Sequence, residues 1–145
     1  MPELPEVETT RRGIEPYLKN RTVKSVTVRN PRLRWPIPKT LAKKLLGQKI
    51  LSVKRRAKYL LIKTEAGTLI LHLGMSGSLR ISAIGTAYRK HDHFALTLSN
   101  GKELRLHDPR RFGAVLWTKS DVYQHPLLAS LGPEPLEKDF NADHL

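Results

Sequence analysis

Short segments with alternating apolar residues, separated by turns, occupy most of the chain between residues 22 and 118. Phe94, Leu96 and Leu98, for example, recur at every second position, and the Asn100-Gly101 pair that follows favours a tight hairpin. This spacing is typical of strands with one buried face. The expected strands cover residues 22–29, 49–56, 59–64, 68–73, 78–82, 94–98, 104–106 and 112–118.

Two helices are expected before the main run of strands. Apolar residues recur at spacings of seven and four between Val7 and Leu18, which predicts a helix over residues 5–18. Thr40 can cap a second, shorter helix, which Gly47 would end. Together these elements predict the α+β class, mainly β: a roughly eight-stranded antiparallel β-sandwich flanked by two helices.

The length of 145 residues is enough for one domain with its own core. We expect that domain over residues 1–130, and we expect residues 131–145 to begin a linker, because Leu131-Gly132-Pro133 opens a proline-containing polar tail. The absence of cysteine excludes disulfides and cysteine-ligated zinc within the chain. No apolar run is long enough to span a bilayer, so no membrane partner is expected.

The charge is strongly basic and unevenly placed. Lys and Arg number 26 against 13 Asp and Glu, and residues 16–64 carry fifteen Lys and Arg with no acidic residue. Such a single-sign stretch favours a polyanionic partner, nucleic acid above all. A generally basic surface kept for solubility and a ribosomal-type RNA binder remain alternatives.

The first three residues, Met1-Pro2-Glu3, can carry chemistry. If Met1 is removed, the Pro2 nitrogen becomes a free secondary amine that can attack a sugar carbon and form an iminium. Glu3 could supply or collect the proton that this step needs. If Met1 stays, the Pro2 nitrogen is an amide and cannot be the nucleophile.

Two basic or glycine-flanked turns could contact nucleic acid. The segment Arg55-Arg56-Ala57-Lys58-Tyr59 brings three cations to one turn, where they suit phosphate contact and a lysine could donate a proton. A solvated basic turn is the alternative. The segment from His72 to Ser78 places Met75 at the tip of a turn between glycines, where it could be a wedge between base pairs rather than core filler. His72 faces away from its leucine neighbours and is interpreted as a packed histidine.

The segment Asp108-Pro109-Arg110-Arg111-Phe112-Gly113 forms another such turn. Arg110 and Phe112 stand two apart, so a strand-like path would point both the same way. A guanidinium beside an aromatic ring can fill the hole left by an extruded base. A capped turn with Phe112 in the core is the alternative.

The segment His91-Asp92-His93 is a poor metal site, because it offers one carboxylate between two histidines. A phosphate contact by His91 and a structural hydrogen bond from Asp92 are the simpler interpretations.

In combination, these segments closely resemble formamidopyrimidine-DNA glycosylases, bacterial base-excision enzymes for oxidised purines. The similar segments occur in family order along the whole chain. They are residues 2–9, 12–13, 56–61, 72–77, 108–113 and 131–136.

The resemblance implies a bifunctional DNA glycosylase and abasic-site lyase. Pro2 would form a Schiff base with the sugar, Glu3 would shuttle protons, and Lys58 would donate the proton for β-elimination. Glu6 would lie beside the reactive end. The residues implied to fill the duplex gap are Met75, Arg110 and Phe112, and those implied to contact DNA are His91 and Arg110.

The resemblance also implies partners and surroundings. The partner would be double-stranded DNA carrying oxidised purines or abasic sites, acted on by a monomer in the bacterial cytoplasm, near the nucleoid. Full-length members continue into a helix–two-turn–helix domain and a zinc finger, so zinc is expected only there and no cofactor is expected in this chain. A chain limited to this part is expected to act weakly or not at all. A non-catalytic double-stranded DNA-binding module is the alternative.

Overall fold

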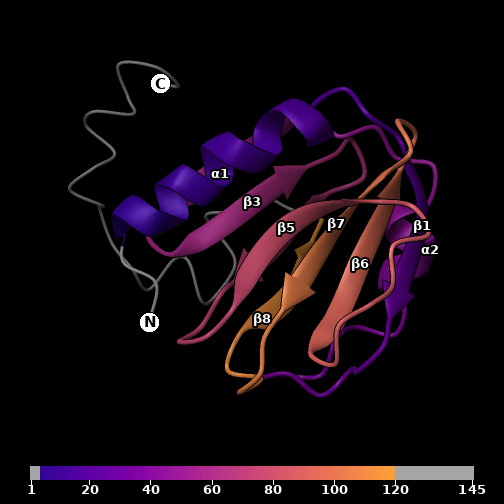
Figure 1. Ribbon diagram of the computed structural model, residues 1–145. Helices are drawn as coiled ribbons and strands as arrows, with labels where there is room; N and C mark the ends of the chain where they lie inside the picture. The colour runs from indigo at the N-terminus through magenta and orange to yellow at the C-terminus, as the bar shows by residue number, and fades with distance from the viewer. Residues whose placement is uncertain (1–3, 120–145) are drawn as a thin grey trace.

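The computed structural model describes residues 4–119, which form two four-stranded antiparallel sheets and two helices (Figure 1). The helices are α1 (Leu4–Leu18) and α2 (Leu41–Leu45). One sheet has, in spatial order, β1 (Val23–Val28), β6 (Asp92–Leu98), β7 (Lys102–His107) and β5 (Ser78–Ala83). The other has β2 (Ser52–Arg56), β3 (Tyr59–Lys63), β4 (Thr68–His72) and β8 (Ala114–Thr118).

The predicted class and the predicted elements are confirmed. Each expected strand and helix is present, with ends shifted by one to three residues in most cases. One detail was wrong: the Thr40 side chain does not cap α2. Thr40 has helical backbone angles (φ −89°, ψ 0°), whereas a capping residue needs an extended backbone to aim its oxygen at the next amides.

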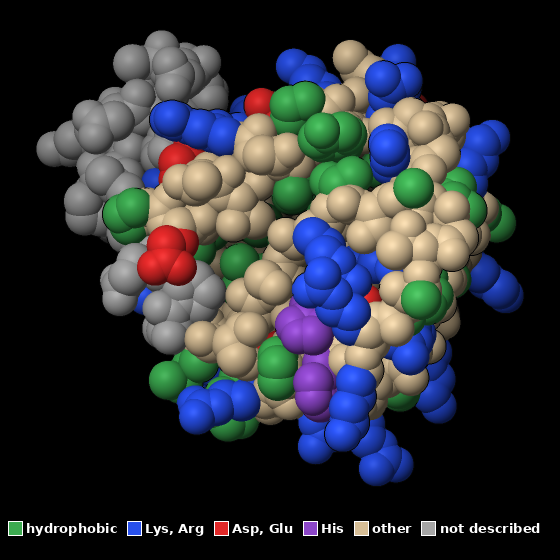
Figure 2. All heavy atoms as spheres, viewed as in Figure 1, with side chains coloured by type: hydrophobic (Ala, Val, Ile, Leu, Met, Phe, Trp, Pro, Cys, Tyr) green, Lys and Arg blue, Asp and Glu red, His purple; other side chains and the backbone are tan. Residues whose placement is uncertain are grey.

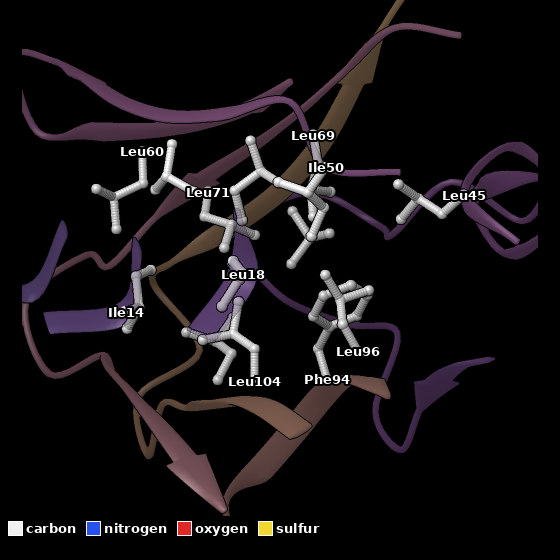
Figure 3. Close-up of a cluster of buried hydrophobic side chains, with 14 of the residues drawn as sticks. Ile14, Leu18, Leu45, Ile50, Leu60, Leu69, Leu71, Phe94, Leu96 and Leu104 are labelled. Atoms are coloured by element: carbon white, nitrogen blue, oxygen red, sulfur yellow. The ribbon is translucent and has the colours of Figure 1, made fainter. Parts of the chain in front are cut away.

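The core lies between the sheets because alternate residues of each strand point inward. Leu60 of β3 and Leu71 of β4 face Leu96 of β6 and Leu104 of β7, and all four are at most 1% exposed (Figure 3). Helix α1 adds Leu18 to the same cluster. Burying one leucine side chain contributes about 1.5–3 kcal/mol, so this shared core fixes the position of both sheets.

The two helices cover different parts of the sandwich. Helix α1 runs along β3 in Figure 1 and packs against β2, β3 and β5, whereas α2 packs against β1 at the other side. Neither helix is long or apolar enough to cross a bilayer, in the part of the chain that the structure describes.

A buried polar network stiffens the sheet that contains β6. The Asp92 carboxylate accepts hydrogen bonds from both terminal nitrogens of Arg80, from the Arg89 amide at 2.7 Å, and makes a 3.0 Å contact with His107 Nδ1. Burial alone would raise the pKa of Asp92, but these hydrogen bonds and the Arg80 charge hold it well below its usual range. The structural interpretation of Asp92 is confirmed.

Candidate nucleic-acid interface

Three turns gather at one end of the sandwich. Tyr59, His72 and Ala114 stand side by side across β3, β4 and β8, so the turns next to these residues share one edge. We call this edge the loop end. It comprises residues 57–58, the Met75 turn (residues 73–77) and the Phe112 turn (residues 108–113).

The turn that carries Lys58 is held in place by a hydrogen bond from Arg55 of the adjacent strand β2. Ala57 has a positive φ of 51°, which is uncommon for a residue with a side chain, and its carbonyl accepts a 2.8 Å hydrogen bond from Arg55 Nη1. Arg55 and Arg56 are only 6% and 7% exposed. The interpretation as a solvated basic turn was therefore wrong for these two arginines, and the Arg55 guanidinium is used inside the fold. Phosphate contact by this turn stays a prediction. Lys58 is half-buried at the tip.

The start of α1 is anchored to the same hairpin. Glu8 accepts hydrogen bonds from Arg11 at 2.9 Å and Arg12 at 2.8 Å, and Arg55 Nε lies 3.4 Å from its carboxylate. Burial would raise the pKa of Glu8, yet hydrogen bonds from Arg11 and Arg12 lower it. Arg11 also donates to the Val53 carbonyl at 3.1 Å. Because Glu8 lies beside Arg55 whereas Arg11 lies beside Val53, α1 and β2 run in opposite directions. The first turn of α1 therefore lies at the loop end.

Replacing Glu8 with glutamine should weaken this anchor. Three guanidinium groups lose their shared carboxylate, and one of them, Arg55, has a fully buried side chain. We expect a loss of about 1–3 kcal/mol in the free energy of unfolding, measured by urea denaturation at pH 7. Glu6→Gln is the matched control because Glu6 is exposed on the same helix. Equal stability of the two variants would contradict the anchor.

The Met75 turn exposes its methionine. Met75 is 50% exposed, which excludes the alternative that it fills the core. The turn is closed by a 2.8 Å hydrogen bond from the Gly77 amide to the Leu73 carbonyl. Gly74 has a positive φ of 65°, and a Cβ there would lie 2.7 Å from the backbone of Phe112, so only glycine fits.

The Phe112 turn exposes an aromatic ring beside two arginines. Phe112 is 47% exposed, so the core alternative is wrong, and Arg110 and Arg111 are exposed as well. The expected strand-like path between Arg110 and Phe112 is also wrong, because Arg111 has a positive φ of 59° and turns the backbone. The carboxylate of Asp108 makes this turn possible by accepting the Arg111 and Gly113 amides.

His72 and Arg34 also lie at the loop end, where the Arg34 amide donates to the Gly113 carbonyl at 3.0 Å. The sequence predicted a binding role for neither. The His72 ring lies 4.7 Å from the Tyr59 ring, and its Nδ1 accepts from the Gly74 amide at 3.0 Å. Burial, and then the charges of Arg34 and Lys58, lower the pKa of His72. A neutral ring that accepts at Nδ1 carries its proton on Nε2, so this atom can donate. The segment around Arg34-Trp35 is basic and aromatic, but nothing in the sequence indicates that it lies near residue 72.

His91 is half-buried and lies next to the first residue of the Phe112 turn. Its ring centre is 5.9 Å from those of His93 and His107, and its carbonyl accepts from the Asp108 amide at 3.0 Å. No group of three or more metal-ligating side chains is arranged to hold a metal ion within residues 4–119. A cysteine-ligated zinc site cannot be built from this chain, which has no cysteine.

The remaining predicted residues are placed only in part. Glu6 is exposed in the first turn of α1. Pro2 and Glu3, like the expected linker at residues 131–145 and the last part of the expected domain, lie outside the described residues.

Basic side chains are common on the surface of the protein. Figure 2 shows Lys and Arg side chains over much of the visible face, few acidic groups, and histidines beside a group of basic side chains. Within residues 4–119, Arg110 and Arg111 make no ion pair, so their charge faces solvent. This end combines exposed cations with an exposed methionine and an exposed ring, the groups that contact phosphates and unstacked bases.

Known proteins share the sequence and the fold. The family model described as the formamidopyrimidine-DNA glycosylase N-terminal domain matches residues 1–115. The formamidopyrimidine-DNA glycosylases of Thioalkalivibrio sulfidiphilus and Shewanella pealeana are 63% and 61% identical over the whole chain, which covers 54% and 53% of their lengths. The chain thus spans about half the length of these relatives.

Solved structures of related proteins have the same fold. The Lactococcus lactis formamidopyrimidine-DNA glycosylase, bound non-covalently to DNA containing an abasic site, matches 95% of this chain and 54% of its own, with a TM-score of 0.84 and 33% identity. A MutM complex with carbocyclic 8-oxo-G DNA matches 89% of this chain and 48% of its own, with a TM-score of 0.80 and 32% identity.

The fold and its loop end define an N-terminal β-sandwich domain of the DNA-glycosylase class. Within that class, the chain belongs to the formamidopyrimidine-DNA glycosylase family.

Proposed function

We propose that this chain forms the catalytic N-terminal part of a bifunctional base-excision-repair enzyme, a DNA glycosylase and abasic-site lyase that removes oxidised purines. The main support is the loop end, where half-buried Lys58 shares one edge with exposed Met75, Arg110 and Phe112. Relatives with the same fold have been solved with DNA carrying abasic or 8-oxo-G sites.

In the proposed reaction, the neutral amine of Pro2 attacks the anomeric carbon of the flipped-out nucleotide. The bond to the damaged base breaks, the base leaves with that bond's electron pair, and a proton is delivered to it. The sugar ring opens to an iminium, with Glu3 moving protons to and from the sugar. The positive nitrogen makes the neighbouring C–H acidic, so loss of that proton expels the 3′ phosphate. Lys58 supplies the proton to the departing phosphate oxygen.

The duplex gap left by the flipped nucleotide is filled, in this proposal, by Met75, Arg110 and Phe112. Unstacking a base costs a few kcal/mol, and an inserted side chain recovers part of that cost by stacking on the neighbours. His91 and Arg110 contact the backbone. We also propose that the protein works as a monomer in the bacterial cytoplasm, on chromosomal DNA, with no cofactor bound by this chain.

Borohydride trapping tests the proposal. The chain, with Met1 removed as shown by intact mass, is incubated with an 8-oxoguanine duplex and with an abasic-site duplex. A borohydride-stable adduct at Pro2 is expected, weaker than that of a full-length relative because the chain spans about half of such a protein. The same chain with Met1 retained should give none, since its Pro2 nitrogen is an amide. Duplex binding without any adduct from the Met1-free chain would favour the alternative, a non-catalytic DNA-binding module.

A further inference from the structure

The Asp108 carboxylate lies between the two exposed turns of the loop end. Its residue is fully buried, at 0% exposure, although it is only two positions from exposed Arg110. A buried carboxylate is costly unless its oxygens are hydrogen-bonded, so its partners show what it does in the fold.

Both oxygens of Asp108 are engaged by neutral donors. Oδ1 accepts from the Ser76 hydroxyl at 2.9 Å and from the Arg111 amide at 3.1 Å, and Oδ2 accepts from the Gly113 amide at 2.8 Å. The Ser76 oxygen in turn accepts from the Arg110 amide at 3.3 Å. Ser76 belongs to the Met75 turn, and the other donors belong to the Phe112 turn. The Asp108–Ser76 hydrogen bond therefore joins the two.

The backbones of the two turns also touch. A Cβ on Gly113 would lie 2.5 Å from the His72 carbonyl oxygen and 2.8 Å from Asp108 Oδ2. A Cβ on Gly74 would lie 2.7 Å from the Gly113 nitrogen. This contact leaves little room for one turn to slide past the other, and the hydrogen bond fixes their relative position.

The choice of neutral donors has an electrostatic consequence. An aspartate beside two arginines would normally pair with them at the surface. Here Asp108 is satisfied by amides and a hydroxyl, so Arg110 and Arg111 stay exposed and their charge is not cancelled.

We propose that Asp108 and Ser76 are positioning residues that clasp the Met75 turn to the Phe112 turn, so that Met75 and Phe112 enter a duplex gap as one rigid unit. This inference rests on the proposed function, because it assigns these side chains to gap filling. Neither Asp108 nor Ser76 touches DNA in this proposal. Both act through the residues that do.

The Ser76→Ala variant removes the link between the turns and keeps the amide hydrogen bonds of Asp108. Ser76 is half-buried, so the fold should be retained, which circular dichroism checks. Ser76→Thr keeps a hydroxyl and should therefore behave like wild type in the binding measurement described next. Ser78→Ala is the matched control, since Ser78 is exposed two residues further along.

The readout is binding of the full 145-residue chain to two duplexes. One carries a tetrahydrofuran abasic analogue opposite 2-aminopurine, whose fluorescence reports insertion at the gap, and the other is undamaged. Wild type should bind the abasic duplex more tightly and change its fluorescence. A hydrogen bond to a charged group supports an effect of roughly tenfold, so Ser76→Ala should lose about that much of the preference, with a smaller fluorescence change. Its affinity for the undamaged duplex should stay within about twofold, because phosphate contacts determine it.

A double-mutant cycle tests whether Ser76 acts through Met75. In a Met75→Ala background, Ser76→Ala should have little further effect on the abasic preference, because the side chain that it positions is gone. Purely additive effects would overturn the clasp, and so would a folded Ser76→Ala variant with the wild-type preference. Equal weakening on both duplexes would also overturn it and indicate a general structural role. If wild type itself shows no preference for the abasic duplex, the proposed function fails and the clasp fails with it.

Discussion

Replacing Asp92 with alanine should cost about 3–5 kcal/mol of the free energy of unfolding, because it leaves Arg80 and His107 beside a buried cavity without their carboxylate. The Arg89 amide also loses its acceptor. Urea denaturation at pH 7 measures the loss. The free energy of unfolding of Asp92→Asn should lie between those of Asp92→Ala and wild type, because asparagine keeps a hydrogen-bond acceptor but has no charge. The control is Glu65→Gln, an exposed position, which should change stability by at most about 0.5 kcal/mol.

The same carboxylate predicts how stability depends on pH. The pKa of Asp92 is lower in the folded protein than in the unfolded chain, where an aspartate carboxyl titrates at about 3.9. Its contribution is therefore complete above that value and is lost as the pH falls through the folded pKa. Acid unfolding of wild type should begin below about pH 5 and should be less steep in Asp92→Asn. Identical acid slopes for the two proteins would show that Asp92 contributes nothing to this dependence.

Leu96→Ala should cost about 2–5 kcal/mol, because Leu96 is fully buried in the cluster that both sheets and α1 share (Figure 3). The loss combines reduced apolar burial with a cavity that the neighbours cannot fill. Thermal or urea unfolding followed by circular dichroism gives the value. The matched variant is Ile84→Ala, whose side chain is 53% exposed and should be nearly neutral. A small effect at Leu96 would mean that the two sheets do not depend on one core.

The strands and helices were predictable because their signals are local. Alternating apolar residues such as Phe94, Leu96 and Leu98 decide which face of a strand joins the main core, whatever lies elsewhere in the chain. The burial of Arg55 was not predictable, because its partner Glu8 is 47 positions away and the surrounding sequence is uniformly basic. Charge patterns indicate where cations occur but not which of them the fold uses internally.

The exposed residues of the site were predictable from the sequence, but the residues that hold their turns in place were not. Met75 stood out because glycines flank it, and Phe112 because it stands two positions from Arg110 on a proline-containing turn; the structure exposes both. The contact between their turns depends on Asp108 and Ser76, which are 32 positions apart and carry no sign of pairing in the sequence. Arg34 escaped assignment for the same reason, because its amide hydrogen-bonds to the distant Gly113 carbonyl. Long-range hydrogen bonds decide such details, and only the folded chain brings their partners together.

The buried Arg55 guanidinium, between the Glu8 carboxylate and the Ala57 carbonyl, has a consequence for the proposed reaction. It holds α1 and the hairpin that carries Lys58 in a fixed relative position before any substrate binds. In the proposed reaction, preorganisation of this kind would spare the entropy of assembling Lys58, the proposed proton donor, at the moment of bond breakage. If the proposed function holds, any conformational change needed to bind a distorted duplex must then occur in the DNA or in parts of the protein other than α1 and this hairpin.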